Sequence, residues 1–373
     1  MDEMLHTTFG NLGEIYDGPH ATPTRLASGP YFLNIASLKS GRLDLDASDH
    51  VSEEDFKHWT RRVTPEPGDL LFSYETRIGE AALMPEGVRA CLGRRMALLR
   101  PDRAIVDPRF LLYYYLGPQF QRIVAQNTIH GATVPRIGLS TMPHWPVIIP
   151  NLTQQRAIAE VLGALDDKIA ANSRLIYIGD QLSSAEVQRA VADGPVVRLG
   201  DILVLNYGKA LPRAKRIPGE VVVYGSGGES GTHIRALVEH SGIIVGRKGT
   251  VGAVYWSNGP HYPIDTTFYV TPLIVGVDPV LYYVLRGSGL ANLNSDSAVP
   301  GLNRDEAYAQ SVRIPERQVL LELSAVVRQR LDWMDSVRRE TARLAQTRDE
   351  LLPLLMSGKL RVKDAEQIVE EIA

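Results

Sequence analysis

Residues 149–178 read IPNLTQQRAIAEVLGALDDKIAANSRLIYI, and the apolar positions in this stretch follow a helical period. They are spaced by 4, 3, 4 and 7 residues, with Asn172 in the gap, and they are Ile158, Leu162, Leu165, Ile169 and Ile176. This spacing is typical of a coiled-coil seam. It predicts a helix over residues 153 to about 186, which is longer than one small domain requires.

The same pattern returns later in the chain. Its apolar positions are Leu320, Leu323, Val327, Leu331, Met334, Leu344, Leu351 and Leu355. Pro353 follows and is expected to kink or end this second helix, because proline lacks the backbone donor that a helix interior needs. Each apolar stripe needs a partner, so we expect the two helices to pack against each other within the chain. The alternative is that each helix lies on its own domain.

Five landmarks occur twice in the same order, which indicates an internal repeat. The first copies lie at residues 12–15, 77–79, 107–108, 131–135 and 149–150, and the second copies at residues 199–202, 248–252, 278–279, 297–300 and 314–315. Chance recurrence of short motifs would explain one such pair, but not five in register. We therefore expect one module to occur twice, with a long helix after each copy.

The modules themselves are expected to mix strands and helices. Residues 220–224 and 252–256 are β-branched or aromatic and are bounded by Gly and Pro, as strands are. The predicted fold class is α+β, with two similar α/β domains joined by two long helices in a coiled coil and related as an internal pseudo-twofold repeat. The predicted ranges are 1–151 and 195–315 for the two domains, and 152–194 and 316–373 for the central and C-terminal helical spacer regions.

The composition is that of a globular protein whose positive charge is local. The chain has 373 residues, 44% of them hydrophobic, and a net charge of −3. This net charge argues against a general polyanion binder, because sequence-independent affinity for nucleic acid comes from Lys and Arg. The single Cys91 excludes an internal disulfide framework. With no apolar signal core and no apolar run of roughly 20 residues, we expect a cytoplasmic protein.

Motifs that carry catalysis are missing from the sequence. There is no Pro-Pro dipeptide of the kind a base methyltransferase uses, and the glycine-rich run at residues 225–231 lacks the dinucleotide-binding pattern. The nine histidines show no metal-ligand spacing. The acidic pair Asp166 and Asp167 lies on the long amphipathic helix, where a solvated face is the expected interpretation. These absences favour a binding protein.

Local basic segments supply candidate contacts to DNA. Between residues 207 and 248 there are seven Lys or Arg against three acidic residues. We expect contacts to phosphates and, at the residues after a predicted strand, to a guanine edge. The candidates in the second module are Lys209, Arg213, Lys215, Arg216, Ser226, Arg247, Lys248 and Asn303. Those in the first module are Asn34, Ser37, Lys39, Arg42, Arg77, Thr133 and Arg136. Each cation taken singly is better explained by an ordinary solvated charge.

The chain resembles a known family, the specificity subunits of type I restriction-modification systems. The resemblance spans nearly the whole chain and is strongest at residues 149–169, which are similar to the family's central region, and at residues 351–360, LLPLLMSGKL, which are similar to its end. The doubled opening at residues 12–15 and 199–202 and the Val-Pro segment before each helix add to it. Residues 314–318 form a degraded second copy of the central segment.

The resemblance implies two target recognition domains that each read one half of a bipartite double-stranded DNA sequence. An antiparallel coiled coil would hold them apart as a ruler. Two methyltransferase (modification) subunits would dock on the helices, bind S-adenosylmethionine and flip an adenine for N6 methylation. Restriction subunits would add cleavage that depends on ATP and Mg²⁺.

The same resemblance implies that this chain is non-catalytic, with no cofactor or metal of its own and no membrane partner. Two other classes stay open from the residues alone. One is a non-catalytic two-domain scaffold that binds protein, and the other is an enzyme in its own right.

Overall fold

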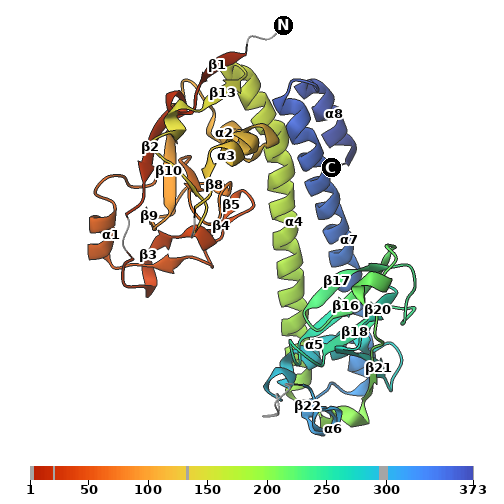
Figure 1. Cartoon of the computed structure of the whole chain (residues 1–373). Coiled ribbons are helices and arrows are strands. Elements are labelled where there is room, and N and C mark those ends of the chain that lie inside the picture. Colours follow the sequence, from red (N-terminus) through yellow and green to blue (C-terminus); the bar gives the residue numbers. More distant parts are fainter. Residues whose placement is uncertain (1–3, 20–21, 132–133, 294–300, 373) are drawn as a thin grey trace. The chain divides into compact units, whose positions relative to one another are not determined.

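The computed structural model describes residues 4–19, 22–131, 134–293 and 301–372. The chain divides into two compact units, one made of residues 1–169 with 342–373 and the other of residues 170–341. We call them the first unit and the second unit and describe each by itself (Figure 1). Within the ranges given above, no helix is long and apolar enough to cross a membrane.

The first unit contains a four-stranded and a three-stranded sheet. Its main strands are β1 Leu5–Thr8, β2 Gly13–Asp17, β3 Leu26–Leu33, β6 Asp49–His50, β7 Leu70–Ser73, β8 Ala81–Leu83, β9 Ala90–Leu92, β10 Met96–Pro101 and β13 Pro146–Ile149. The larger sheet has the order β2-β10-β7-β8 and is antiparallel. The smaller sheet has the order β6-β3-β9, and its β3–β9 pair is parallel. A separate antiparallel pair joins β1 to β13.

Short elements complete the first module. They are the strands β4 Leu38–Lys39, β5 Arg42–Leu43, β11 Thr128–Ile129 and β12 Arg136–Ile137, and the helices α1 Glu53–Trp59, α2 Pro108–Leu116 and α3 Pro118–Gln126. β4 pairs with β5, and β11 pairs with β12.

The second unit repeats this arrangement. Its strands are β14 Val196–Arg198, β15 Leu203–Tyr207, β16 Val221–Gly225, β17 Gly228–His233, β18 Gly242–Gly246, β19 Val254–Ser257, β20 His261–Pro263, β21 Thr267–Pro272 and β22 Ser311–Arg313, and its short helices are α5 Asp278–Gly287 and α6 Arg304–Ala309. The larger sheet has the order β15-β21-β18-β19, and the smaller has the order β17-β16-β20 with a parallel β16–β20 pair. The strand orders match those of the first unit one for one, so the predicted internal repeat and the α+β class are confirmed.

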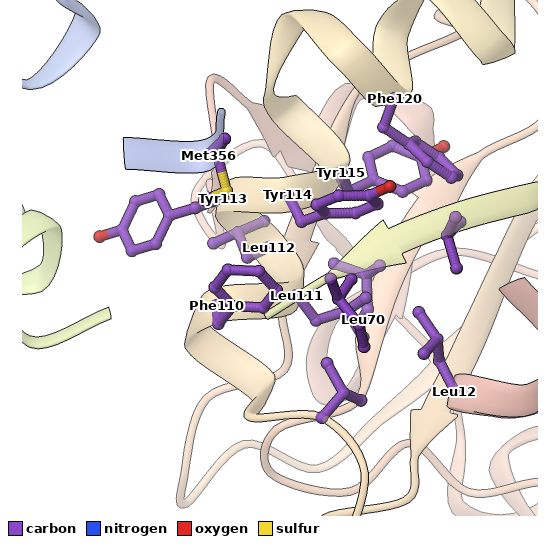
Figure 2. Packing of buried hydrophobic residues seen from close by; sticks show 14 of the residues in the cluster. Leu12, Leu70, Phe110, Leu111, Leu112, Tyr113, Tyr114, Tyr115, Phe120 and Met356 are labelled. Carbon is purple, nitrogen blue, oxygen red and sulfur yellow. The ribbon is translucent and has the colours of Figure 1, made fainter. Parts of the chain in front are cut away.

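Helix α2 supplies much of the first unit's core. The Asp107 carboxylate caps the helix by accepting the Phe110 backbone N–H at 3.0 Å, and Pro108 occupies the first turn, where a missing N–H is harmless. Tyr115 is fully buried, with its ring centroid 5.6 Å from that of Phe72 and 4.9 Å from that of Phe120. Figure 2 shows this aromatic run of α2 together with Leu12, Leu70 and Met356. Burying each large side chain contributes about 1.5–3 kcal/mol.

Two long helices, α4 Leu152–Ala192 and α7 Arg317–Met356, contribute to both units. In the first unit, buried α4 residues share one core with buried α7 residues; they are Ile158, Leu162 and Leu165 with Leu344, Leu351 and Leu355. The same core contains Phe110 and Leu111 of α2, so α4 also lies on its own module.

The second unit contains the other halves of the same helices. Val327, Leu331 and Met334 of α7 are buried there, and Ile176 of α4 and Leu323 pack against them half-buried. A Cβ added at Gly179 would lie 3.1 Å from the Met334 sulfur, so the helices approach closely at this point. Within the second unit, the Asn172 side-chain amide donates to Glu340 at 3.1 Å and Arg330 donates to the Ser183 hydroxyl at 2.9 Å, so later positions of α4 meet earlier positions of α7. The predicted pairing of the two helices is confirmed, and it is antiparallel.

The ends of the long helices differ from the prediction. Helix α4 starts one residue early, at Leu152, because the Asn151 side chain accepts the Gln154 N–H at 3.0 Å and caps it. Helix α7 does not end at Pro353 but runs on to Met356. A further helix, α8 Val362–Ile372, buries Ala365 in the first unit's core.

Candidate nucleic-acid interface

Several loops of the second module meet where β15 and β18 end and β21 begins. The backbone N–H groups of Arg247 and Lys248 both donate to the Thr266 carbonyl, at 2.9 and 3.1 Å, and the Gly208 N–H donates to the Thr267 carbonyl at 3.0 Å. Leu302 donates to the Arg247 carbonyl at 2.8 Å. We call the loops at residues 207–217, 225–228, 247–252, 263–266 and 301–304 the second-module face.

Two glycine-containing turns of this face, at residues 225–228 and 247–252, lie against each other. Gly249 has a φ of +83°, and a Cβ there would stand 3.0 Å from the Ser226 hydroxyl oxygen. The Tyr255 hydroxyl donates to the Ser226 carbonyl at 3.0 Å and holds the turn. The fold therefore brings Lys209, Ser226, Arg247, Lys248 and Asn303 onto one surface.

Four cations of the second-module face point into solvent. Lys209, Arg213, Lys215 and Lys248 are all exposed. Among the residues that the structure describes, none of these four is in an ion pair. An unpaired exposed cation is what a phosphate contact requires, since its counterions are free to be released.

Arg247 is held differently from Lys248. Its Nη2 donates to the Asp265 carbonyl at 2.7 Å, and its guanidinium lies 5.2 Å from the centroid of the Tyr207 ring. Arg304 lies over the same ring at 5.3 Å. The sequence analysis missed Tyr207, which is 51% exposed between the two guanidiniums, and it missed Arg304. No local pattern joins residues 97 positions apart, so only the fold could find them.

Two further candidates of the second module serve the loops themselves. Arg216 donates to the Ser230 carbonyl at 2.6 Å and is half-buried. The Asn303 side chain caps α6 by accepting the Asp305 N–H at 2.8 Å. Their contact to DNA stays a prediction. In the structure, each of the two side chains stabilises the local fold of its own loop.

The corresponding end of the first module carries Arg77, Arg95 and Arg136. Tyr74 donates its N–H to the Arg95 carbonyl at 3.2 Å, and Ile137 donates to the Tyr74 carbonyl at 2.8 Å, which repeats the hydrogen bonds around Arg247. We call residues 22–25, 34–36, 74–80, 93–95 and 134–136 the first-module face.

Cations of the first module are mostly paired with acids. Arg77 donates to the Ile35 carbonyl at 3.0 Å and lies 3.4 Å from a Glu80 oxygen. Lys39 lies 3.5 Å from an Asp44 oxygen. Arg136 is exposed, and its backbone bridges that of Glu75.

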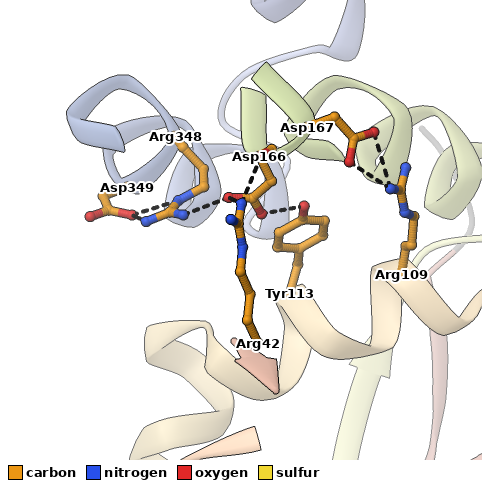
Figure 3. A network of polar contacts seen from close by, with 7 residues as sticks. All are labelled: Arg42, Arg109, Tyr113, Asp166, Asp167, Arg348 and Asp349. Carbon is orange, nitrogen blue, oxygen red and sulfur yellow. Dashed lines mark hydrogen bonds and ion pairs between the residues drawn. The ribbon is translucent and has the colours of Figure 1, made fainter. Parts of the chain in front are cut away.

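Two other first-module candidates, Ser37 and Arg42, stand apart from this face. Ser37 is fully buried, and its hydroxyl accepts the Asn34 N–H at 3.1 Å within a 3₁₀ turn that Asn34 also caps. Arg42 points to α4, where it donates to the Asp166 carbonyl at 2.6 Å (Figure 3). Thr133 lies outside the described residues.

A hollow of about 400 Å³ opens beside the first-module face. Three arginines line it, namely Arg25, Arg94 and Arg95, together with Asn34 and Asp49. Arg25 lies 3.1 Å from an Asp49 oxygen, and Arg94 is exposed. Arg25 was not a candidate in the sequence analysis because it stands alone in its segment, 69 residues before Arg94.

The hydrogen bonds also fix the register between the two modules. Ser73 donates to the Glu80 carbonyl just as Gly246 donates to the Ala253 carbonyl, which aligns Gly79 with Gly252. Lys248 then corresponds to Glu75, and Arg77 to Thr250. The predicted landmarks, residues 77–79 and 248–252, differ in length and left this register open.

Potential metal ligands do not gather in the described residues. No group of three His, Cys, Asp or Glu there could hold a metal ion. Burial raises the pKa of the Cys91 thiol to about 12, so it stays protonated at neutral pH. His261 is buried, and that burial lowers its pKa.

The comparisons with known proteins agree on one family. Residues 35–177 match the family described as "Type I restriction modification DNA specificity domain". The putative type I restriction enzyme MjaX specificity subunit of Methanocaldococcus jannaschii is 21% identical over 415 residues, which cover 94% of this chain and 92% of that protein. The fold is similar to the crystal structure of a type I restriction-modification S subunit from M. genitalium, with a TM-score of 0.67 and 19% identity over 95% of this chain and 96% of that one. Together with the duplicated modules and the paired helices, these matches make the chain similar to the specificity subunits of type I restriction-modification systems.

Proposed function

We propose that this chain reads a bipartite sequence in double-stranded DNA and directs adenine methylation and cleavage by partner subunits. Each module would contact one half-site. The observation that carries the proposal is the repeated module, which presents basic loops at the same end of the same sheet in both copies. Phosphate contacts would position each module, and base contacts from the same loops would select the sequence.

The proposed division of labour follows the predicted ranges. Residues 1–151 and 195–315 would be the target recognition domains, and residues 152–194 and 316–373 the helical spacer regions. The chain would be non-catalytic and cytoplasmic. S-adenosylmethionine, ATP and Mg²⁺ would be bound by the partners.

Methyltransferase subunits are proposed to dock on the long helices. Within the second unit, α4 exposes Leu175, Ile178 and Leu182 at spacings of three and four residues, which places them on one helical face. α7 exposes Val319, Val326 and Trp333 at spacings of seven. Exposed apolar stripes of this kind are typical of interaction surfaces. Restriction subunits would join the assembly through these partners.

Mapping N6-methyladenine in cells with and without the gene tests the proposal. Loss of methylation at one bipartite motif with a fixed gap would support it. An unchanged map, together with DNA affinity that does not fall between about 50 and 200 mM salt, would instead favour a scaffold that binds protein.

A further inference from the structure

A single carboxylate on α4 collects contacts from three other elements of the first unit. Asp166 accepts the Tyr113 hydroxyl of α2 at 2.7 Å and a guanidinium N–H of Arg348 in α7 at 2.6 Å (Figure 3). Arg42 of β5 lies 3.5 Å from the same carboxylate and also donates to the Asp166 backbone carbonyl. The expectation that this acidic pair would form a solvated face is wrong for Asp166, whose side chain is only 21% exposed.

The contacts of Asp166 differ in kind from those of its neighbour. Asp167 pairs with Arg109 alone, at 3.0 Å, and both side chains are more than half exposed. Exposed pairs of this type contribute little. The Asp166 network is shielded, and burial, followed by the Asp166 charge, raises the pKa of Tyr113 and keeps its hydroxyl a donor.

A second anchor ties the module to the start of α4. Gln155 is fully buried; its side chain accepts the Asp107 N–H at 2.9 Å and donates to the Ile105 and Pro150 carbonyls. Gln155 and Asp166 are 11 residues apart on one helix, which is about 16 Å. The contacts of Gln155 fix the point at which the first module is attached to α4. The contacts of Asp166, about 16 Å further along the helix, fix the angle of the module.

We propose that Asp166 is a positioning residue that sets the angle of the first module on the paired helices and so restricts the gap between half-sites that the chain accepts. This inference rests on the proposed function. Adding one base pair to the gap moves a half-site by about 3.4 Å along the duplex and rotates it by about a tenth of a turn. A module held at two points resists that displacement, whereas a module held at Gln155 and by apolar contacts alone tolerates more of it.

The test uses the full chain in complex with its methyltransferase subunits, on duplexes that keep the native half-sites and vary the gap by one and two base pairs. Asp166→Asn should lower the preference for the native gap over the next longer one by about tenfold. Single base changes within a half-site should cost the same in the variant as in the parent complex. Asp167→Asn is the matched control and should keep the parent's gap profile.

Further variants distinguish a positioning role of Asp166 from a general effect on stability. Tyr113→Phe removes one hydroxyl at the same carboxylate and should relax the gap preference in the same direction, so it replaces Asp166→Asn if that variant does not assemble. The double variant should be no worse than Asp166→Asn alone. A native gap profile in assembled Asp166→Asn or Tyr113→Phe complexes would overturn the inference, as would equal losses of gap and half-site preference. A parent complex with no half-site preference would instead contradict the proposed function.

Discussion

The two modules share one backbone topology but treat their cations differently. On the first-module face, Arg77 and Arg95 each have an acidic partner, Glu80 and Glu75, within 3.4 Å, while Arg94 and Arg136 are exposed. On the second-module face, Lys209, Arg213, Lys215 and Lys248 are exposed, and the described residues offer them no ion pair. A paired arginine has already exchanged its counterions for a carboxylate, so it gains less from a phosphate. We therefore expect the second module, with more exposed cations outside ion pairs, to be the stronger source of salt-dependent affinity for DNA.

The largest expected effect comes from removing the four exposed cations together. The variant Lys209→Ala, Arg213→Ala, Lys215→Ala, Lys248→Ala should lose roughly 100-fold in DNA affinity, and the slope of log affinity against log salt should shrink by about three to four. Fluorescence anisotropy of the methyltransferase complex between about 50 and 200 mM salt measures both quantities.

The matched control neutralises four cations of the first module, Arg25, Lys39, Arg77 and Arg95. These are paired with Asp49, Asp44, Glu80 and Glu75, so the salt slope should change by less than half as much. Equal slopes for the two variants would remove the difference between the modules.

Alanine substitutions at the adjacent residues Arg247 and Lys248 should have different effects, one on stability and the other on DNA binding. Arg247→Ala should lower the free energy of unfolding by about 1–2 kcal/mol, because it removes the bond to the Asp265 carbonyl and the packing over Tyr207. Lys248→Ala should leave stability within about 0.5 kcal/mol and reduce the salt slope by about one. Thermal unfolding and the salt titration together distinguish the two. Indistinguishable variants would contradict the assignment.

Removing the acidic partner of one first-module arginine should raise the DNA affinity of the first module. Asp49→Asn removes the negative charge 3.1 Å from Arg25, while its side-chain oxygen still accepts the Asn34 amide. DNA affinity should rise a few-fold at low salt, with the slope steeper by about one, as for one added phosphate contact. A titration with unchanged affinity would show that Arg25 does not reach the duplex.

The sequence predicted the architecture well because the architecture is periodic. The heptad spacing from Ile158 to Ile176 and the doubled landmarks depend on local order, and both long helices and the repeat followed from them. The site was predicted less well, because the ion pairs and hydrogen bonds of its side chains join residues that are far apart in the sequence. Nothing near Arg42 signals Asp166, which is 124 residues away, and nothing near Arg25 signals Asp49.

Counting charges also overestimated some candidates for the same physical reason. Ser37 and Arg42 stand in a polar, basic stretch, yet one is buried in a turn and the other binds α4. A side chain's availability depends on which acceptors the fold brings near, and the acceptors come from distant segments.

The smallest expected effect concerns acid stability and again separates the units. Burial lowers the pKa of His261 below its ordinary value of about 6.5, and its ring Nδ1 lies 3.0 Å from the Gly259 carbonyl oxygen. The unfolded chain therefore binds a proton near pH 6.5 that the folded chain does not, so this group's contribution to stability is present above pH 6.5 and declines as the pH falls below it. From pH 7.5 to 6.0 the second unit should lose a few tenths of a kcal/mol. Hydrogen exchange, corrected for its intrinsic pH dependence, should show more opening in β18 than in β7, and His261→Gln should remove that difference. Equal opening of the two strands in the parent chain would refute the prediction, because β7 and β18 hold the same place in their sheets and differ in having His261 nearby.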